Sequence, residues 1–267
     1  MTRFSEIFTR PKPLIGVIHL PPLPGYAACP GIDKLVSKAL GDLQVCERAG
    51  LDGILVENEY DRPHRLLATA EITAAMTRVT NAVRQDAINC VTGCEILLND
   101  PRASLAVAKA SGACFIRTDY FTDPMYRQEY GNMVIDAPGL LDYRKDISAE
   151  DVLILADIQV KYAKMTVKRS LAESARIAGE AGADAIIVTG DETGHAPSLS
   201  CLKEVKLAAG RLPVLIGSGC SIENAGELLS CCDGAIVGTS LIENQQIDFS
   251  RATGLVRVRD NLVETCP

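Results

Sequence analysis

The chain has 267 residues, with 34 acidic against 27 basic side chains and a net charge of −7. This charge, without any basic block, excludes a typical nucleic-acid surface, and no apolar run is long enough for a membrane span or a signal-peptide core. The chain is 47% hydrophobic but only 4% aromatic, so we expect an aliphatic core of buried parallel strands. The length suits one α/β barrel, which typically takes about 250 residues.

Strand and helix patterns alternate along the chain. Strands are expected at residues 14–20, 53–58, 90–98, 114–121, 152–159, 185–189, 213–217 and 235–237. Amphipathic helices are expected between them at 34–49, 69–85, 101–110, 170–181, 199–209 and 222–231. This alternation indicates βαβ units, so residues 1–267 are predicted to form a single (β/α)8 TIM barrel of the α/β class.

Two features qualify this regular pattern. Segments 47–56 and 180–188 are similar to each other, because each combines a helix end, a glycine cap, an Asp and a buried strand. Segment 122–149 is rich in Tyr, Asp, Gly and Pro, and we expect it to be an extended loop over the barrel mouth.

Ten cysteines are scattered through apolar strand and helix patterns, without a Cys-x-x-Cys pair. Buried thiols of this kind behave as small hydrophobic side chains. We therefore expect reduced, largely buried cysteines in a cytoplasmic protein, with zinc binding as the minor alternative.

Two glycine-containing turns follow the last two predicted strands. Segment 213–219 ends in Gly217-Ser218-Gly219, and segment 233–241 contains Gly238-Thr239-Ser240. Such turns, one helix apart at the carboxyl end of a barrel, typically let backbone N–H groups bind a phosphate. The alternative is that these glycines only permit tight turns between strand and helix.

Polar side chains also occur at the predicted strand ends, where barrel enzymes carry their active sites. His19, Glu57, Arg117, Asp157 and Lys161 come from the first, second, fourth and fifth strands. In a catalytic interpretation Asp157 or Glu57 is a general base, Arg117 or Lys161 stabilises negative charge, and His19 is an acid, base or ligand. In a structural interpretation Arg117 forms a buried ion pair that closes the barrel.

Several of these segments match one family. The chain resembles the BtpA/SgcQ family of TIM-barrel proteins over nearly its whole length, most specifically in HLPPLPG at 19–25 and VEN at 56–58. Other matching segments are 99–100, 115–117, 155–157, 160–161, 187–190, 213–219 and 233–241. From these matches we expect Asn99, Thr189 and Gly190 to join the substrate-binding residues. The family's namesake is linked to photosystem I biogenesis, and other members lie in apparent carbohydrate operons.

The chain departs from the family pattern toward a more acidic mouth, because Glu95 and Asp119 stand where relatives usually carry Asn. Together with Glu57, Asp157 and Asp191, they could face one point. Clustered carboxylates require a cation or a raised pKa. The alternatives are a divalent metal (Mg or Mn) bound by Glu57, Glu95 and Asp157, a tight network around Arg117, or side chains that point outward.

The combined expectation is a cytoplasmic isomerase, lyase or hydrolase that performs acid/base chemistry on a small phosphorylated sugar- or nucleoside-type metabolite. No nucleic-acid partner and no membrane span are expected, and a homo-oligomer is left open. The alternative is a non-catalytic assembly or regulatory factor that kept the ligand pocket, because a fold alone does not decide function.

Overall fold

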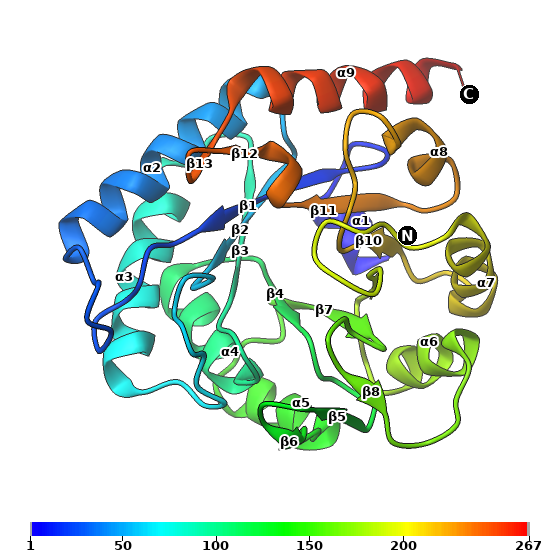
Figure 1. Cartoon of the computed structure of the whole chain (residues 1–267), viewed down its shortest axis with the longest axis horizontal. Helices are drawn as coiled ribbons and strands as arrows, with labels where there is room; N and C mark the ends of the chain where they lie inside the picture. Colours follow the sequence, from blue (N-terminus) through cyan, green and yellow to red (C-terminus); the bar gives the residue numbers. More distant parts are fainter. Residues whose placement is uncertain (1, 266–267) are drawn as a thin grey trace.

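The eight predicted strands close into one parallel barrel in the computed structural model, which describes residues 2–265. Around the barrel the strand order is β1-β11-β10-β9-β7-β4-β3-β2 (Figure 1). The predicted (β/α)8 fold is therefore confirmed. The barrel strands are β1 (Leu14–His19), β2 (Gly53–Glu57), β3 (Val91–Glu95), β4 (Phe115–Thr118), β7 (Leu153–Ile158), β9 (Ala185–Val188), β10 (Val214–Ile216) and β11 (Gly234–Val237).

Helices surround the ring of strands (Figure 1). They are α2 (Ile32–Ala49), α3 (Ala70–Asp86), α4 (Pro101–Ser111), α5 (Ala137–Asp146), α6 (Leu171–Glu180), α7 (Leu199–Ala209), α8 (Ala225–Ser230) and α9 (Phe249–Thr265), with the short α1 (Arg3–Ile7) before β1 and the 3-10 turn η1 (Thr239–Leu241) after β11. Among residues 2–265, no helix has the length and apolar character needed to cross a membrane.

Segment 122–149 is more ordered than predicted. It contains β5 (Met125–Arg127), β6 (Gly131–Asn132) and the barrel helix α5, and β5 also pairs with β8 (Lys164–Met165). A second small sheet pairs β12 (Ile242–Glu243) with β13 (Gln246–Ile247). The expected plain loop is therefore wrong for this segment, although its irregular composition does mark an insertion after β4.

Alternate residues of the strands face two different cores. Val17, Leu55, Leu155 and Ile187 belong to the core inside the barrel, whereas their neighbours pack outward against the helices. The interior also takes Phe115 because Gly93 on the adjacent strand has no side chain, and a Cβ there would overlap the ring. Burial on both faces explains why the strands are nearly continuous apolar runs.

The aspartates of the repeated Gly-and-Asp segments link the beginnings of neighbouring strands. Asp52, Asp184 and Asp233 stand directly before β2, β9 and β11. Each accepts a hydrogen bond from a backbone N–H at the beginning of a neighbouring strand, at 2.7–2.9 Å. These carboxylates therefore stabilise the amino ends of the strands, away from the end that carries barrel active sites.

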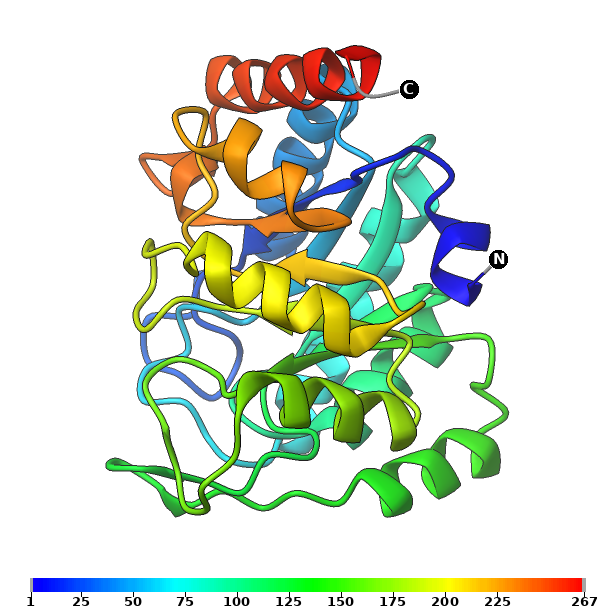
Figure 2. The ribbon, with the colours of Figure 1, turned by 90° about the vertical axis from the view of Figure 1, so that its right-hand side faces the viewer.

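Helix α1 covers the amino end of the barrel. Figure 2 shows it on the side opposite the tips of the long loops. Phe4 and Phe8 stack with a centroid distance of 4.6 Å, and Phe8 lies 5.7 Å from the ring of Phe115 inside the barrel. This end of the barrel is therefore filled by aromatic side chains.

The cysteines between residues 2 and 265 are all free. Cys46, Cys90, Cys94, Cys220 and Cys232 are buried, as expected, and the remaining four are half-buried. Cys266 lies outside the described residues.

Candidate active site

Two adjoining cavities occupy the carboxyl end of the barrel, with volumes of about 510 Å³ and 430 Å³. The first cavity lies beside β10, β11 and β1, and the second lies beside β2, β3 and β4. They share five lining residues, which form the boundary between them: Glu57, Glu59, Arg117, Lys161 and Thr193. The two cavities thus form the two halves of one barrel mouth.

Both glycine turns line the first cavity. Gly217, Ser218 and Gly219 follow β10, and Gly238, Thr239 and Ser240 follow β11. The serine hydroxyls fasten the turns, since Ser218 Oγ donates to the His195 carbonyl at 2.8 Å and Ser240 Oγ donates to the Cys220 carbonyl at 2.6 Å. The structure brings together all six residues that the sequence suggested for phosphate binding.

Gly219 adopts a left-handed backbone with φ +69°. A Cβ at this position would overlap the backbone of Ala196, which crosses directly over it. The glycine is therefore required both by its conformation and by the close approach of the loop. A valine at this position would displace the loop as well as alter the cavity.

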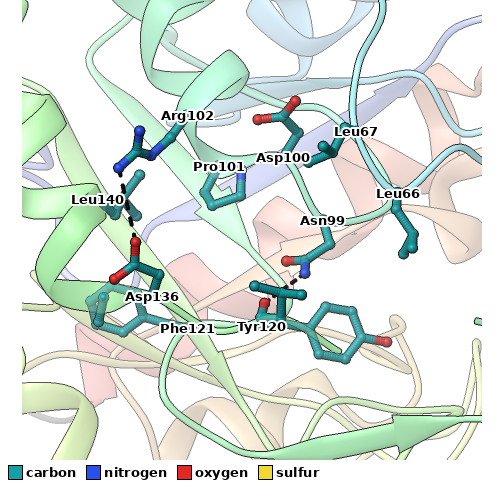
Figure 3. Close-up of a pocket in the computed structure, with 12 residues that line it drawn as sticks. Leu66, Leu67, Asn99, Asp100, Pro101, Arg102, Tyr120, Phe121, Asp136 and Leu140 are labelled. Carbon is teal, nitrogen blue, oxygen red and sulfur yellow. Dashed lines mark hydrogen bonds and ion pairs between the residues drawn. The ribbon is translucent and has the colours of Figure 1, made fainter. Parts of the chain in front are cut away.

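Thr189, Gly190 and Asn99 lie outside both cavities. Thr189 Oγ1 accepts a hydrogen bond from Lys161 N at 3.3 Å, and Gly190 N donates to Ser218 Oγ at 2.8 Å, so these two residues support the cavity wall. Asn99 lines a separate apolar pocket near α4 and α5, where its side-chain amide donates to the Val134 carbonyl (Figure 3). We therefore no longer place Asn99 with the substrate-binding residues.

Arg117 lies at the centre of the acidic cluster. Its guanidinium donates two hydrogen bonds to Asp157, Nε–Oδ2 at 2.8 Å and Nη2–Oδ1 at 3.0 Å. Three more carboxyl groups face it at longer distances: Glu57 at 3.6 Å, Glu95 at 3.7 Å and Asp119 at 4.0 Å. The Arg117 side chain is only 6% exposed. One buried guanidinium therefore serves four carboxyl groups, which is the network alternative of the sequence prediction.

Strand register places the key acids side by side. In the parallel ladder, His19 of β1 pairs with Glu57 of β2, and Glu57 pairs with Glu95 of β3. Because parallel neighbours in register project to the same face, these three side chains meet at one level of the mouth.

Burial changes the protonation of the cluster. Desolvation raises the pKa of Glu57 to about 7, only partly opposed by Arg117. Desolvation and the nearby Asp119 carboxylate raise the pKa of Glu95 well above its usual range. The pKa of Asp119 itself rises to about 6, again through burial first and then through Asp157. Glu57 therefore exchanges its proton near neutral pH, and Glu95 ionises less readily than an ordinary carboxyl group.

His19 and Lys161 complete the boundary between the cavities. Burial lowers the pKa of His19 to about 4, so its imidazole is neutral at physiological pH. Its Nε2 lies 3.9 Å from Glu57 Oε2, and its ring packs edge-on against Tyr60. Lys161 lines both cavities, and no acidic side chain between residues 2 and 265 lies within 4.0 Å of its ammonium.

Two expectations about the acids need revision. Asp157 was the first candidate for the base, but its side chain is completely buried and both its oxygens are engaged by Arg117. Asp191 is exposed and lines neither cavity, so it adds nothing to the acidity of the mouth.

The three suggested metal ligands, Glu57, Glu95 and Asp157, surround the guanidinium of Arg117. Within the described chain, no three His, Cys, Asp or Glu side chains are arranged to hold a metal ion. The geometry therefore gives the metal alternative no ligand set, and we derive no step through a metal.

Sequence reasoning missed the loop residues of the second cavity. Arg62 and His64 come from the loop after β2, whereas Arg127 and Tyr162 belong to the segments around β5 and β8. Their presence near the site could have been suspected only from the unusual length of these two loops. Their positions depend on how the loops fold back over the barrel.

The sequence matches the model of the BtpA family over residues 10–261. The chain belongs to the BtpA family. An uncharacterized protein from Archaeoglobus fulgidus is 36% identical over 246 residues, which cover 92% of this chain and 98% of the relative. The photosystem I biogenesis protein BtpA of Synechocystis is 34% identical over 258 residues, covering 94% and 89% of the two chains.

Solved structures share the fold of this BtpA-family barrel. One is (S)-3-O-geranylgeranylglyceryl phosphate synthase from Thermoplasma acidophilum in complex with its substrate sn-glycerol-1-phosphate. Its TM-score is 0.61 at 16% identity, and the match covers 97% of this chain and 98% of the other. This likeness concerns the fold.

Proposed function

We propose that this BtpA-family barrel is an enzyme that carries out acid/base chemistry on a small phosphorylated sugar- or nucleoside-type substrate, as an isomerase, lyase or hydrolase. The observation that carries the proposal is the shared boundary of the two cavities. It places an ionisable carboxyl group, Glu57, directly beside a cavity lined by the two glycine turns. The structural neighbour that was solved with sn-glycerol-1-phosphate supports a phosphate at this end of the fold.

In this proposal the phosphate is bound by backbone N–H groups of the two turns. The hydroxyls of Ser218 and Ser240 hold the turns in place through their own hydrogen bonds. Lys161 faces the same cavity and adds positive charge without being tied to an acid within 4.0 Å. The phosphate thereby fixes one end of the substrate against the carboxyl end of β10 and β11.

Glu57 is the proposed general base. Its pKa of about 7 lets it accept and return a proton near neutral pH, which is the condition for efficient acid/base catalysis. Neutral His19, adjacent in the strand register, can donate or accept a hydrogen bond at the reacting group. Arg117 is positioned by Asp157 and stabilises negative charge that develops in the substrate.

The phosphate end is tested with Thr239→Glu and its size-matched control Thr239→Gln. Thr239 is exposed at the start of η1, so both side chains can be accommodated. The added carboxylate should weaken the binding of inorganic phosphate about tenfold or more, while the neutral glutamine should change it much less. Calorimetric titration measures both. Equal effects of the two variants would contradict the proposed phosphate position.

Catalysis is tested by turnover of the phosphorylated sugars and nucleosides that stabilise the protein in a thermal-shift screen. Glu57→Gln should retain ligand binding but reduce turnover by about 10²–10⁴-fold, because it removes the base and keeps the shape. The second candidate function is a non-catalytic assembly factor, favoured by the name of the Synechocystis relative. If ligands bind equally well to the parent protein and to Glu57→Gln, and neither protein turns them over, the assembly-factor alternative is favoured.

A further inference from the structure

Three acidic side chains, Glu57, Glu95 and Asp119, form what we call the floor of the second cavity. Together with Asp157 they outnumber the cations near them. Glu57, Glu95 and Asp119 line this cavity, and all three depend on the guanidinium that already forms two hydrogen bonds with Asp157. Their distances to Arg117 are 3.6–4.0 Å, too long for hydrogen bonds. Four carboxyl groups thus share one guanidinium, whose two hydrogen bonds both go to Asp157.

Two oxygen atoms of this floor have no hydrogen-bond partner apart from the contact between the two acids themselves. They are Glu57 Oε1 and Glu95 Oε2, on side chains that are only 7% and 2% exposed. An unpaired buried polar atom is costly, and a native structure normally satisfies it with protein, water or ligand. Both residues line the second cavity, so a group that enters it can approach them.

The other cations of the second cavity are Arg62 and Arg127, and the Nε of Arg127 has no hydrogen-bond partner. Arg62 pairs with Glu59. Arg127 lies 3.5 Å from Glu129, and its guanidinium also lies near the faces of two tyrosine rings, at 5.6 and 5.7 Å from their centroids. Lys161 stands at the boundary with the first cavity, where the proposed phosphate needs it. Even if Lys161 turned toward the floor, it would join Arg117 and Arg127, so that three cations would face four carboxyl groups.

We propose that the second cavity binds a protonated amino group of the same ligand, so that the substrate is a phosphorylated amine such as an amino-sugar phosphate. This inference rests on the proposed phosphate site in the first cavity. An ammonium group brings a positive charge and three donors, whereas a hydroxyl brings one donor and no charge. Charge-assisted hydrogen bonds to carboxylates are also the stronger kind. Glu95 is the principal acceptor, with Asp119 and Glu57 beside it.

Proton release is a signature of this arrangement. The raised pKa values of Glu57 and Glu95 favour the protonated form of these two acids when no cation lies beside them. An ammonium ion favours the ionised carboxylates, so its binding expels protons, while a hydroxyl does not. The charged groups that face these two acids are Arg117, Lys161, Glu59, Asp119 and Asp157, together with His19, which stays neutral.

Matched pairs of ligands test the inference by calorimetry at about pH 6.5, where simple amines are protonated. One pair is glucosamine 6-phosphate and glucose 6-phosphate, and a shorter pair is phosphoethanolamine and ethylene glycol monophosphate. In at least one pair the amine should bind about tenfold more tightly or better. Because the phosphate group can itself exchange protons at this pH, measurements in two buffers of different ionisation enthalpy should show more proton release for the amine than for its hydroxyl partner.

Glu95→Gln is the decisive variant, because the amide keeps the shape of the carboxyl group but cannot ionise to a carboxylate. It should reduce the preference for the amine to about threefold or less and diminish the proton release. Glu180→Gln, an exposed change of the same type on α6, is the matched control and should keep both. If Glu95→Gln fails to fold, Asp119→Asn serves the same purpose.

The outcomes separate this inference from the proposed function. Inorganic phosphate that binds without any preference for the amine partner in either pair overturns the amine and leaves the phosphate site intact. Failure of phosphate and of all four ligands to bind overturns both. Stabilisation by Mg²⁺ or Mn²⁺ that disappears in Glu95→Gln would assign the missing charge to a metal and overturn the amine.

Discussion

Glu57 makes the stability of the protein depend on pH in a defined direction. Its pKa is raised from an ordinary value of 4.5 to about 7, mainly by burial. The folded state therefore binds the proton more tightly than the unfolded state. The corresponding stability is complete below pH 4.5 and is lost as the pH rises through 7.

Glu57→Gln should remove this dependence. The variant and the parent should have similar free energies of unfolding near pH 4.5, whereas near pH 8 the variant should be more stable by about 1–3 kcal/mol. Urea denaturation at several pH values measures the difference between the two proteins. A constant difference across this range would show that burial does not raise the pKa of Glu57.

Asp157 has a different task from Glu57, although both are carboxyl groups on barrel strands. Asp157→Asn should destabilise the protein by about 1.5–3 kcal/mol, because it weakens the two hydrogen bonds of Arg117 while three other carboxyl groups still face the guanidinium. Asp151→Asn is the control, since Asp151 forms an exposed ion pair with Lys109. That change should cost less than about 1 kcal/mol. Thermal unfolding compares the two, and an equally small effect would restore Asp157 as a free base.

At the scale of elements, α1 contributes stability at the end of the barrel that lies away from the candidate site. Phe8 is 4% exposed and fits against β2 because Gly53 lacks a side chain, where a Cβ would lie 2.9 Å from the Phe8 ring. Phe8→Ala should destabilise the protein by about 3–5 kcal/mol through the cavity it leaves. Inorganic phosphate binding at the opposite end should be unchanged.

Leu207→Ala, on another helix, provides the exposed control for Phe8→Ala. Leu207 is 86% exposed on α7, so its truncation should change the free energy of unfolding by less than about 0.5 kcal/mol. Chemical denaturation and phosphate titration of both variants check the prediction. Loss of phosphate affinity in Phe8→Ala would mean that the two ends of the barrel are coupled.

The strands were predictable from the sequence because each is an apolar run buried on both faces, which few other elements imitate. Several helices were not. Helix α5 begins with Ala137-Pro138-Gly139, residues that are typical of a loop, and its N-cap is Asp136. Helix α1 has only five residues, too few to show periodicity. Local composition therefore located the barrel strands, but it did not locate every helix that covers them.

The candidate site divides in the same way. Residues at strand ends, such as His19 and Glu57, could be placed together because parallel strands carry them to one level. The sequence could not show that four carboxyl groups surround Arg117. That arrangement depends on the distances between side chains that come from different strands. Arg62 and His64 were missed because a loop has no fixed repeat that fixes the direction of its side chains.

At the scale of the whole molecule, the closed barrel separates two tasks. Aromatic packing and strand-capping aspartates stabilise the amino end, as Phe8 and Asp52 illustrate. Raised carboxyl pKa values and unpaired oxygens gather at the carboxyl end, where Glu57 and Glu95 lie. Buried carboxyl groups without full hydrogen bonding reduce the stability of the folded state. They are concentrated at the end where a bound ligand could supply the missing hydrogen bonds, which is the pattern of a binding site.

The cysteines report on the integrity of the whole barrel. The buried thiols have raised pKa values, caused first by desolvation, which reach about 12 for Cys220 and Cys232. Only the thiolate reacts rapidly with alkylating reagents, so burial and a raised pKa protect these residues together. The protected set should comprise Cys46, Cys90, Cys94, Cys220 and Cys232.

Alkylation of the native protein, followed by peptide mass spectrometry, should therefore modify the half-buried Cys29, Cys201 and Cys231 well before the protected set. All ten cysteines should react in denaturant, because none is expected to be in a disulfide or bound to zinc. A closed barrel has no edge strand that can open separately, so the protected thiols should become labelled together at the rate of global unfolding. Early labelling of Cys94 alone would show that β3 opens locally, and a native mass that includes zinc would contradict the assignment of free thiols.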